Sequence, residues 1–206
     1  MYFAAHGGAF APPCRVMFGT MGQRPIWLVG MMGAGKSAVG PLLARSLERG
    51  FVDTDLEIER SVGMAVSEIF AAEGERAFRD RERQLIEGLS GASEVVALGG
   101  GAISQPDVAA FLRRTGTVVY LKASPSLLLS RLGNASARPL LHGLAPEGRL
   151  ARLETLLIER ASAYETAAIT VDTEIRTAAA VVEEILRRLN PAKSEHESDV
   201  EKGVRV

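Results

Sequence analysis

Residues 30–37 read Gly30-Met31-Met32-Gly33-Ala34-Gly35-Lys36-Ser37 and follow directly on the apolar run Ile26-Trp27-Leu28-Val29. They match the pattern G-x-x-x-x-G-K-[ST], in which a strand ends, a glycine-rich loop begins and a helix follows. Glycines let successive backbone N–H groups turn around a phosphate, and the start of the helix adds its positive dipole end. The pattern therefore predicts a nucleotide-binding loop made by Gly33, Ala34, Gly35, Lys36, Ser37 and Ala38.

The last two residues of the loop carry its chemistry. Lys36 is expected to place a positive charge beside the β- and γ-phosphates, and Ser37 to offer a hydroxyl to Mg²⁺. A chance match on a glycine-rich turn is the alternative. The apolar residues from Val39 to Leu47 argue against it, because they recur at helical spacing where the pattern requires a helix.

Composition limits the classes of protein to which the chain can belong. The 206 residues are 47% apolar and 24% charged, which fits one globular domain with a proper core. Lys and Arg number 24 against 25 Asp and Glu, so no overall field attracts nucleic acid or an anionic membrane. The one cysteine, Cys14, fits a reducing compartment, and no apolar run reaches the ~18 residues of a membrane span. We expect a cytoplasmic protein with neither partner.

Hydrophobic periodicity predicts strands that alternate with helices. The expected strands are 26–29, 51–53, 94–98, 117–121 and 168–171, and the expected helices are 36–48, two or three within 55–90, 106–114, 124–132, 149–164 and a last one containing 181–189. Gly50 is expected to cap the first helix. Residues 133–148 lose periodicity over a length that suits a lid. The alternation predicts a parallel sheet with helices on both faces.

The two ends of the chain do not share this pattern. Residues 1–24 mix Gly, Pro and small apolar residues without periodicity, and residues 191–206 are polar. We expect a disordered leader, a single domain over residues 25–190 and a disordered tail. Met17 and Met21 lie just before the first strand, which suggests the hypothesis that translation begins there.

Two carboxylates follow the second strand. Asp53 and Asp55 stand where a parallel sheet brings strand ends to the same edge as the phosphate loop. Asp53 can hold Mg²⁺ or its waters, and Asp55 can accept a proton from a substrate hydroxyl. The alternative is that both residues only cap the following helix, where acids favour the dipole. The neighbouring loop favours the functional interpretation.

The chain resembles the shikimate kinases over about residues 25–190. Five motifs occur in that family's order and spacing: the loop at 30–37, Phe51-x-Asp53-x-Asp55, Glu75-x-x-Phe78-Arg79-x-x-Glu82, Gly99-Gly100-Gly101 and Arg138-Pro139-Leu140-Leu141. The resemblance implies transfer of a phosphoryl group from ATP to the 3-hydroxyl of shikimate, a step towards chorismate and the aromatic amino acids. It also implies a three-layer α/β/α fold whose five-stranded parallel sheet has the order 2-3-1-4-5, with a lid and a small helical substrate-binding region.

The resemblance assigns the substrate site. It implies that Arg79 and Arg160 grip the carboxylate of shikimate, that Asp55 takes hydroxyls, and that the N–H groups of Gly100 and Gly101 reach the ring. The planar fork of arginine suits a carboxylate because it forms two parallel bonds. Glu82, three residues after Arg79, could hold that guanidinium in place. Plainer alternatives are a solvated helix charge for Arg79 and a tight turn for the glycines.

The resemblance also assigns the remaining nucleotide contacts. Arg138 would close on the phosphates from the lid and offset the charge that develops during transfer, with an ordinary exposed loop arginine as the alternative. Arg131 resembles the position that stacks on adenine. The predicted catalytic residues are then Asp55, Lys36 and Arg138, and the predicted magnesium ligands are Ser37 and Asp53.

Two rival functions remain at this point. One is another small kinase with the same loop, for gluconate or a nucleoside monophosphate; the combination of Asp53-x-Asp55 with the triple glycine argues against it. The other is a nucleotide-binding regulatory module that has lost catalysis, which the retention of Arg79, Arg138 and Arg160 disfavours. No heptad seam or repeat suggests assembly, so a monomer is expected.

Overall fold

The computed structural model describes residues 24–133, 139–141, 143–174 and 176–190. The expected tail, all of the expected leader except Arg24, and Arg138 lie outside these residues. In the part that is described, no helix combines the length and the apolar character needed to cross a membrane.

Five parallel strands form one sheet in the order β2-β3-β1-β4-β5, which confirms the expected topology. The strands are β1 (Ile26–Val29), β2 (Phe51–Asp53), β3 (Val95–Ala97), β4 (Thr117–Lys122) and β5 (Ile169–Asp172). The central strand β1 pairs with β3 and β4, so that Leu28 lies beside Ala97 on one side and Val119 on the other. The phosphate loop therefore leaves the sheet from its middle.

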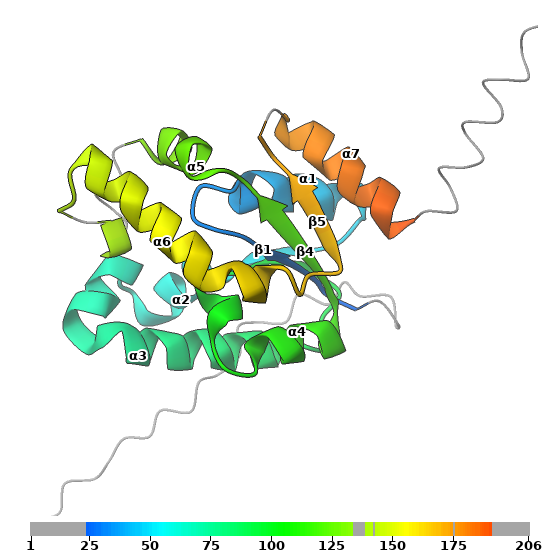
Figure 1. The fold of residues 1–206 in the computed structure, drawn as a ribbon. Helices are drawn as coiled ribbons and strands as arrows, with labels where there is room; N and C mark the ends of the chain where they lie inside the picture. Colours follow the sequence, from blue (N-terminus) through cyan, green and yellow to red (C-terminus); the bar gives the residue numbers. More distant parts are fainter. Residues whose placement is uncertain (1–23, 134–138, 142, 175, 191–206) are drawn as a thin grey trace, which may run out of the picture.

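Helices cover both faces of the sheet (Figure 1). One face carries α1 (Lys36–Ser46) and α7 (Ala178–Leu189), and the other carries α3 (Val66–Gly88) and α4 (Val108–Thr115). Successive strand side chains point to opposite faces, so Leu28 packs with the first pair of helices and Trp27 with the second. Strands β1 and β3 are buried on both faces.

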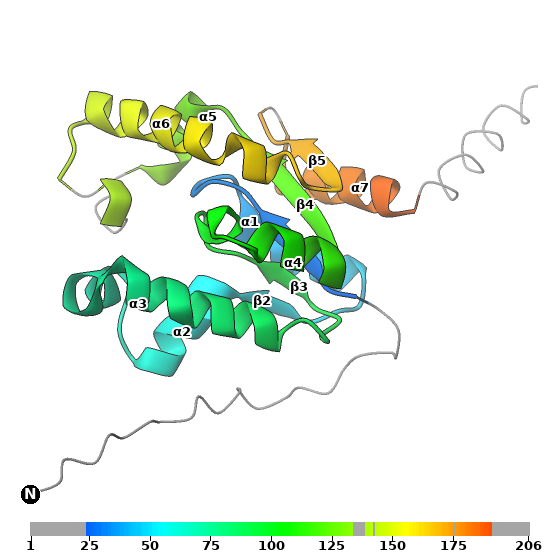
Figure 2. The same cartoon turned by 60° about the horizontal axis from the view of Figure 1, so that its bottom comes forward.

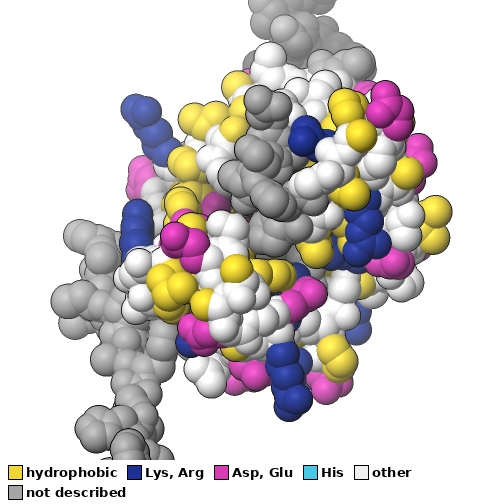
Figure 3. Space-filling view, turned by 90° about the vertical axis from the view of Figure 1, so that its left-hand side faces the viewer, with side chains coloured by type: hydrophobic (Ala, Val, Ile, Leu, Met, Phe, Trp, Pro, Cys, Tyr) yellow, Lys and Arg dark blue, Asp and Glu magenta, His cyan; other side chains and the backbone are white. Residues whose placement is uncertain are grey.

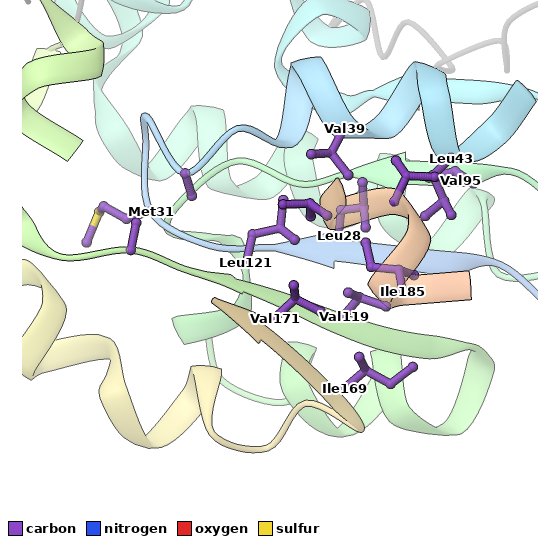
Figure 4. Packing of buried hydrophobic residues seen from close by; sticks show 14 of the residues in the cluster. Leu28, Met31, Val39, Leu43, Val95, Val119, Leu121, Ile169, Val171 and Ile185 are labelled. Carbon is purple, nitrogen blue, oxygen red and sulfur yellow. The ribbon is translucent and has the colours of Figure 1, made fainter. Parts of the chain in front are cut away.

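Figure 4 shows the first of these interfaces, where strand and helix side chains interdigitate. Leu28, Val119 and Val171 come from three strands and meet Val39 of α1 and Ile185 of α7. All five side chains are at most 2% exposed. This packing holds α1, and with it the end of the phosphate loop, against the centre of the sheet.

Helix α3 also belongs to a small helical region, as expected. This region consists of α2 (Thr54–Val62) and α3, which have a cluster of their own made by Ile58, Ile69, Phe78 and Leu85. Helix α3 is interrupted at Gly74, whose φ of 84° and ψ of 165° are not helical. The apolar pattern within residues 55–90 therefore corresponds to α2 and two segments of α3.

The remaining helices flank the cleft described below. They are α5 (Pro125–Leu132), whose N-cap Ser124 accepts the N–H of Leu127, and α6 (Pro146–Tyr164). Helix α6 begins three residues before the predicted Arg149, because Pro146 occupies its first turn, where a missing N–H costs nothing. The described part of the expected lid contains a short 3₁₀ turn, η3 (Pro139–Leu141).

The predicted cap at Gly50 is wrong. Helix α1 is capped by Leu47, and Glu48 takes the left-handed conformation that was expected of the glycine, with a φ of 54°. Gly50 instead lies against Glu94 at the start of β3, where a Cβ would come within 2.9 Å of the Glu94 Cγ. Gly50 is therefore a close neighbour of the Glu94 side chain and does not end the helix.

Candidate active site

The phosphate loop joins β1 to α1 through strained backbone that only glycine tolerates well. Gly30 has a φ of 149°, and a Cβ there would lie 2.7 Å from the carbonyl oxygen of Leu121 on β4. The Lys36 ammonium donates to the carbonyls of Gly30 at 2.7 Å and Met31 at 3.1 Å. The lysine thus closes the loop on itself and keeps its charge at the loop's centre.

The two predicted magnesium ligands lie side by side. The Ser37 hydroxyl donates to Asp53 Oδ2 at 2.9 Å, while Oδ1 of the same carboxylate accepts the N–H of Asp55 at 3.2 Å. Asp53 therefore does cap α2, as the plainer interpretation held, and it also faces the phosphate loop. A hydroxyl and a carboxylate are hard oxygen donors, and two such ligands suit Mg²⁺, which keeps most of its waters or phosphate oxygens. These residues fit that ion.

Arg79 of α3 is held between two carboxylates. Its Nη1 donates to Glu82 Oε2 at 2.7 Å, and its Nε and Nη2 donate to Glu75 Oε1 at 3.2 and 3.0 Å. The Glu82 side chain is fully buried, whereas that of Glu75 is 54% exposed. The guanidinium also lies over the rings of Phe70 and Phe78, at 6.0 and 5.3 Å from their centroids. Arg79 is a positioned group and not a solvated helix charge.

The pKa values of Arg79 and Glu82 are both shifted from their ordinary values. Burial raises the pKa of the Glu82 carboxyl, and the neighbouring Arg79 offsets this only in part, while Asp55 adds to the rise. Burial alone would lower the pKa of Arg79, but the two glutamates outweigh it and the net pKa is raised. The guanidinium therefore stays charged at any physiological pH, which is what a carboxylate-binding group requires.

The triple glycine lies where these side chains converge. A Cβ on Gly101 would come within 2.6 Å of Arg79 Nη2, and one on Gly99 would overlap the carboxylate of Glu82 and lie 2.7 Å from Asp55 Oδ1. The N–H of Gly99 donates to the hydroxyl of the fully buried Thr54 at 3.1 Å. The glycines form a tight turn and, at the same time, leave room for the charged groups beside it.

Two donors from α6 hold the carbonyl of Gly100. Arg160 Nη1 donates at 3.0 Å and the Tyr164 hydroxyl at 2.6 Å. Tyr164 in turn stacks on Tyr120 with centroids 4.7 Å apart, and burial raises its pKa to about 12. Because the C=O and N–H of a trans peptide point in opposite directions, the N–H of Gly101 faces away from α6.

Arg131 of α5 lies at the other end of the site. Its Nη2 donates to the carbonyl of Thr173 at 2.8 Å and its Nη1 to the Thr173 hydroxyl at 3.1 Å. A longer contact of 3.4 Å joins Nη1 to the carbonyl of Ala34. The side chain thus bridges the phosphate loop and the segment after β5, at the edge where a nucleotide on the loop would end.

One cleft of about 380 Å³ brings these groups together at the carboxyl ends of the strands. Helices α2 and α3 flank one side of it and α5 and α6 the other (Figure 2). Of the predicted site residues, the cleft is lined by Gly33, Gly35, Lys36, Ser37, Ala38, Asp53, Asp55, Arg79, Gly100, Gly101, Arg131 and Arg160. Ala34, in the same loop, is buried and does not line the cleft.

Charge on the surrounding surface is mixed. On the face drawn in Figure 3, Lys and Arg side chains are interspersed with Asp and Glu and form no broad patch of one sign. An anion in the cleft would therefore be held by the local cations Lys36, Arg79, Arg131 and Arg160, as the near-zero net charge predicts.

Several residues of the site were not predicted from the sequence. Tyr164 could have been found, because it lies four residues after Arg160 and so on the same helix face. Thr54 and Thr173 carry no motif. Gln105 also donates to Glu82 from 23 residues away, a contact that only the fold creates.

Comparisons with known proteins agree with this geometry. The family model described as shikimate kinase matches residues 32–190. The shikimate kinase of Chlorobium limicola is 44% identical over 170 residues, covering 80% of this chain and 85% of that protein. That of Ralstonia nicotianae is 43% identical over 169 residues, covering 81% and 87%.

Solved structures agree as well. The shikimate kinase of Acinetobacter baumannii, determined in complex with shikimate, superposes with a TM-score of 0.78 at 40% identity, covering 84% of this chain and 96% of that one. The shikimate kinase of Aquifex aeolicus gives a TM-score of 0.69 at 34% identity, covering 81% and 96%.

Proposed function

The chain belongs to the shikimate kinase family, and we propose that it transfers the γ-phosphate of ATP to the 3-hydroxyl of shikimate, giving 3-phosphoshikimate and ADP. The observation that carries the proposal is that one cleft joins a phosphate loop to two arginines and a carboxylate. The loop accounts for the donor, and Arg79, Arg160 and Asp55 account for an acceptor that carries both a carboxylate and hydroxyls.

The nucleotide would lie along the loop from Lys36 to Arg131. The loop N–H groups and the α1 N-terminus bind the phosphates, and the Lys36 ammonium moves from the loop carbonyls to the β- and γ-phosphates. Arg131 bounds the adenine end. Ser37 and Asp53 would hold Mg²⁺, which would offset the negative charge of the phosphates when bound.

Shikimate would lie between α3 and α6. Arg79 and Arg160 bind its carboxylate, and the N–H of Gly101, directed away from α6, donates to the ring substituents. The apolar rings of Phe70 and Phe78 form the wall beneath. This orientation presents a hydroxyl to Asp55, which accepts its proton as the oxygen attacks the γ-phosphate in line.

Catalysis in this scheme is mostly positioning and electrostatics. Arg138 is proposed to close on the phosphates and to offset the charge that develops during transfer. Closure excludes water, which would otherwise hydrolyse ATP. We further propose a cytoplasmic, monomeric enzyme on the route to chorismate and the aromatic amino acids, with neither nucleic acid nor a membrane as a partner.

ADP release from MgATP with shikimate, gluconate or no acceptor tests the proposal. The full chain and a version that starts at Met21 are compared, because residues 1–24 are proposed to be a dispensable leader. We expect shikimate-dependent release from both versions. Release only with gluconate would support the assignment of the phosphate loop but contradict that of the acceptor site. No release with any acceptor would favour a regulatory module.

A further inference from the structure

The Glu82 carboxylate is held from two elements. Its Oε2 accepts Arg79 Nη1 from α3 and Gln105 Nε2 from the segment after the triple glycine, each at 2.7 Å. Gln105 directly follows the 3₁₀ turn η1 (Ala102–Ser104). The contact therefore ties the glycine turn to the helix that carries Arg79.

Gln105 is itself held firmly by its backbone. Its N–H donates to the carbonyl of Ala102 at 3.1 Å, and its carbonyl accepts the N–H of Val108 at 3.3 Å, at the start of α4. Its amide must present nitrogen to Glu82, because the opposite orientation would set two oxygens against each other. A rigid donor thus faces the carboxylate.

A donor at this place restricts how Glu82 can turn. The terminal torsion of a glutamate is soft, so the carboxylate can rotate unless hydrogen bonds fix its direction. Glu82 Oε1 is buried and has no hydrogen-bond partner among the described residues, so the two bonds to Oε2 are the contacts that set the rotation. Arg79 in turn has its Nη2 against the backbone of Gly101.

We propose that Gln105 is a positioning residue for the acceptor substrate: by orienting Glu82, it holds the Arg79 guanidinium in the plane that receives the carboxylate of shikimate. The inference rests on the proposed function, since it takes Arg79 as a carboxylate ligand. It goes beyond that function by linking the glycine turn and Arg79 into one unit, so that the groups contacting the ring and the carboxylate keep their relative position.

The orientation comes at a cost to stability. Gln105 Oε1 is buried without a hydrogen-bond partner among the described residues, and such an atom is unfavourable. A residue chosen only for packing would not need that oxygen. An apolar side chain of the same length would fill the space without an unsatisfied oxygen. Substitution can therefore separate the packing role of Gln105 from its role as a hydrogen-bond donor to Glu82.

Gln105→Met is the informative variant, because methionine keeps the length of the side chain and removes the donor. We expect the KM for shikimate to rise about tenfold, the loss of one hydrogen bond to a charged group. The KM for ATP and kcat should stay within about twofold, and thermal stability should change little, because the hydrogen bond lost to Glu82 is offset by removal of the unsatisfied Gln105 Oε1. Gln105→Asn keeps the amide but is too short to reach Glu82, and it carries the same kinetic expectation.

Ser104→Ala is the matched control, since Ser104 is the exposed neighbour on the same turn and should leave all constants unchanged. A double-mutant cycle with Glu82→Gln identifies the route of action. If Gln105 acts through Glu82, Gln105→Met should add little in the Glu82→Gln background.

An unchanged KM for shikimate in Gln105→Met, an equal loss for ATP and shikimate, or an effect that persists fully in the Glu82→Gln background would each overturn the inference. Absence of shikimate-dependent ADP release from the wild-type chain would overturn the proposed function as well. The two failures are therefore distinguishable in one set of assays.

Discussion

Asp55 lies at the junction of β2 and α2, beside the glycine turn and within the cleft. Asp55→Asn keeps the shape of the side chain but cannot accept a proton. We expect kcat to fall by about 10²–10⁴-fold, the usual contribution of a general base, while the affinity for ATP is kept. Steady-state kinetics with both substrates varied checks this, and near-normal turnover would remove Asp55 from the mechanism.

Glu82 makes the site sensitive to acid. Because burial raises its pKa, Glu82 becomes protonated at a higher pH than an ordinary carboxyl group and then loses its ionic hold on Arg79. The KM for shikimate should therefore rise as the pH falls towards the raised pKa of Glu82, while the KM for ATP changes less. In Glu82→Gln the KM for shikimate should be high throughout and nearly independent of pH.

Protonation of Glu82 should weaken shikimate binding but increase the free energy of unfolding. A carboxyl group with a raised folded-state pKa is less stable ionised in the folded protein than in the unfolded chain, so its charge costs folding free energy at neutral pH. That cost disappears as the pH falls through the folded-state pKa. A KM for shikimate that stays constant over this range would show that Glu82 does not control Arg79.

Spacing along one helix could predict some of the contacts between residues and not others. Arg79 and Glu82 are three residues apart on α3, and their pairing was expected from that spacing. Gln105 reaches the same carboxylate from 23 residues away, after a strand and a turn have brought it back. Contacts of this second kind depend on the path of the backbone, which local pattern does not specify.

At the scale of elements, α3 offers a matched pair of glycines. Gly74 interrupts the helix with a φ of 84°, whereas Gly88 is the last residue of α3. A Cβ added at either glycine would have no neighbour within 4 Å. Gly74→Ala should cost about 1–3 kcal/mol, because the backbone conformation there is strained for any residue with a Cβ. Gly88→Ala should instead stabilise by about 0.5–1 kcal/mol, by lowering the entropy of the unfolded chain.

Chemical denaturation of both variants measures the difference. The KM for shikimate adds a functional readout, since Arg79 lies five residues after Gly74 and the break sets the direction of that segment. Equal changes in the free energy of unfolding of the two variants would show that the positive φ of Gly74 does not require glycine.

The ends of elements show where periodicity stops being informative. The strands and helices were found in the right order, because apolar spacing reports which face of each element is buried. Helix α1 ended early and Gly50 served packing instead, since the approach of Glu94 is a tertiary contact. Helix α6 began early at Pro146, which periodicity does not mark.

The whole molecule should respond to its substrates as one cooperative unit. Residues from β1, β2, β3, α3, α5 and α6, or the loops that follow them, line the cleft, so ligands that bind it stabilise most of the fold. Shikimate at about 100 times its Kd should raise Tm by about 5–10 °C. Thermal unfolding with shikimate, with gluconate as the control, measures this; an equal shift with both acids would contradict the acceptor assignment.

The architecture was predictable at two levels. Alternating strands and helices after a phosphate loop indicate a parallel sheet covered on both faces. The order 2-3-1-4-5 came from the family resemblance and is confirmed. Twelve of the predicted residues line the same cleft, because the loops at the strand ends meet at one edge and helices α3, α5 and α6 bring Arg79, Arg131 and Arg160 to it.

The exposed contact between Glu75 and Arg79 has a consequence for recognition. The guanidinium is already paired with a carboxylate before any substrate arrives. If Arg79 binds the carboxylate of shikimate, as proposed, binding would exchange one carboxylate for another: the half-exposed Glu75 would return to water while the buried Glu82 stays in place. Most of the desolvation cost of Arg79 is met when the protein folds. An analogue of shikimate without the carboxylate would therefore bind weakly, because it could not displace Glu75 from Arg79.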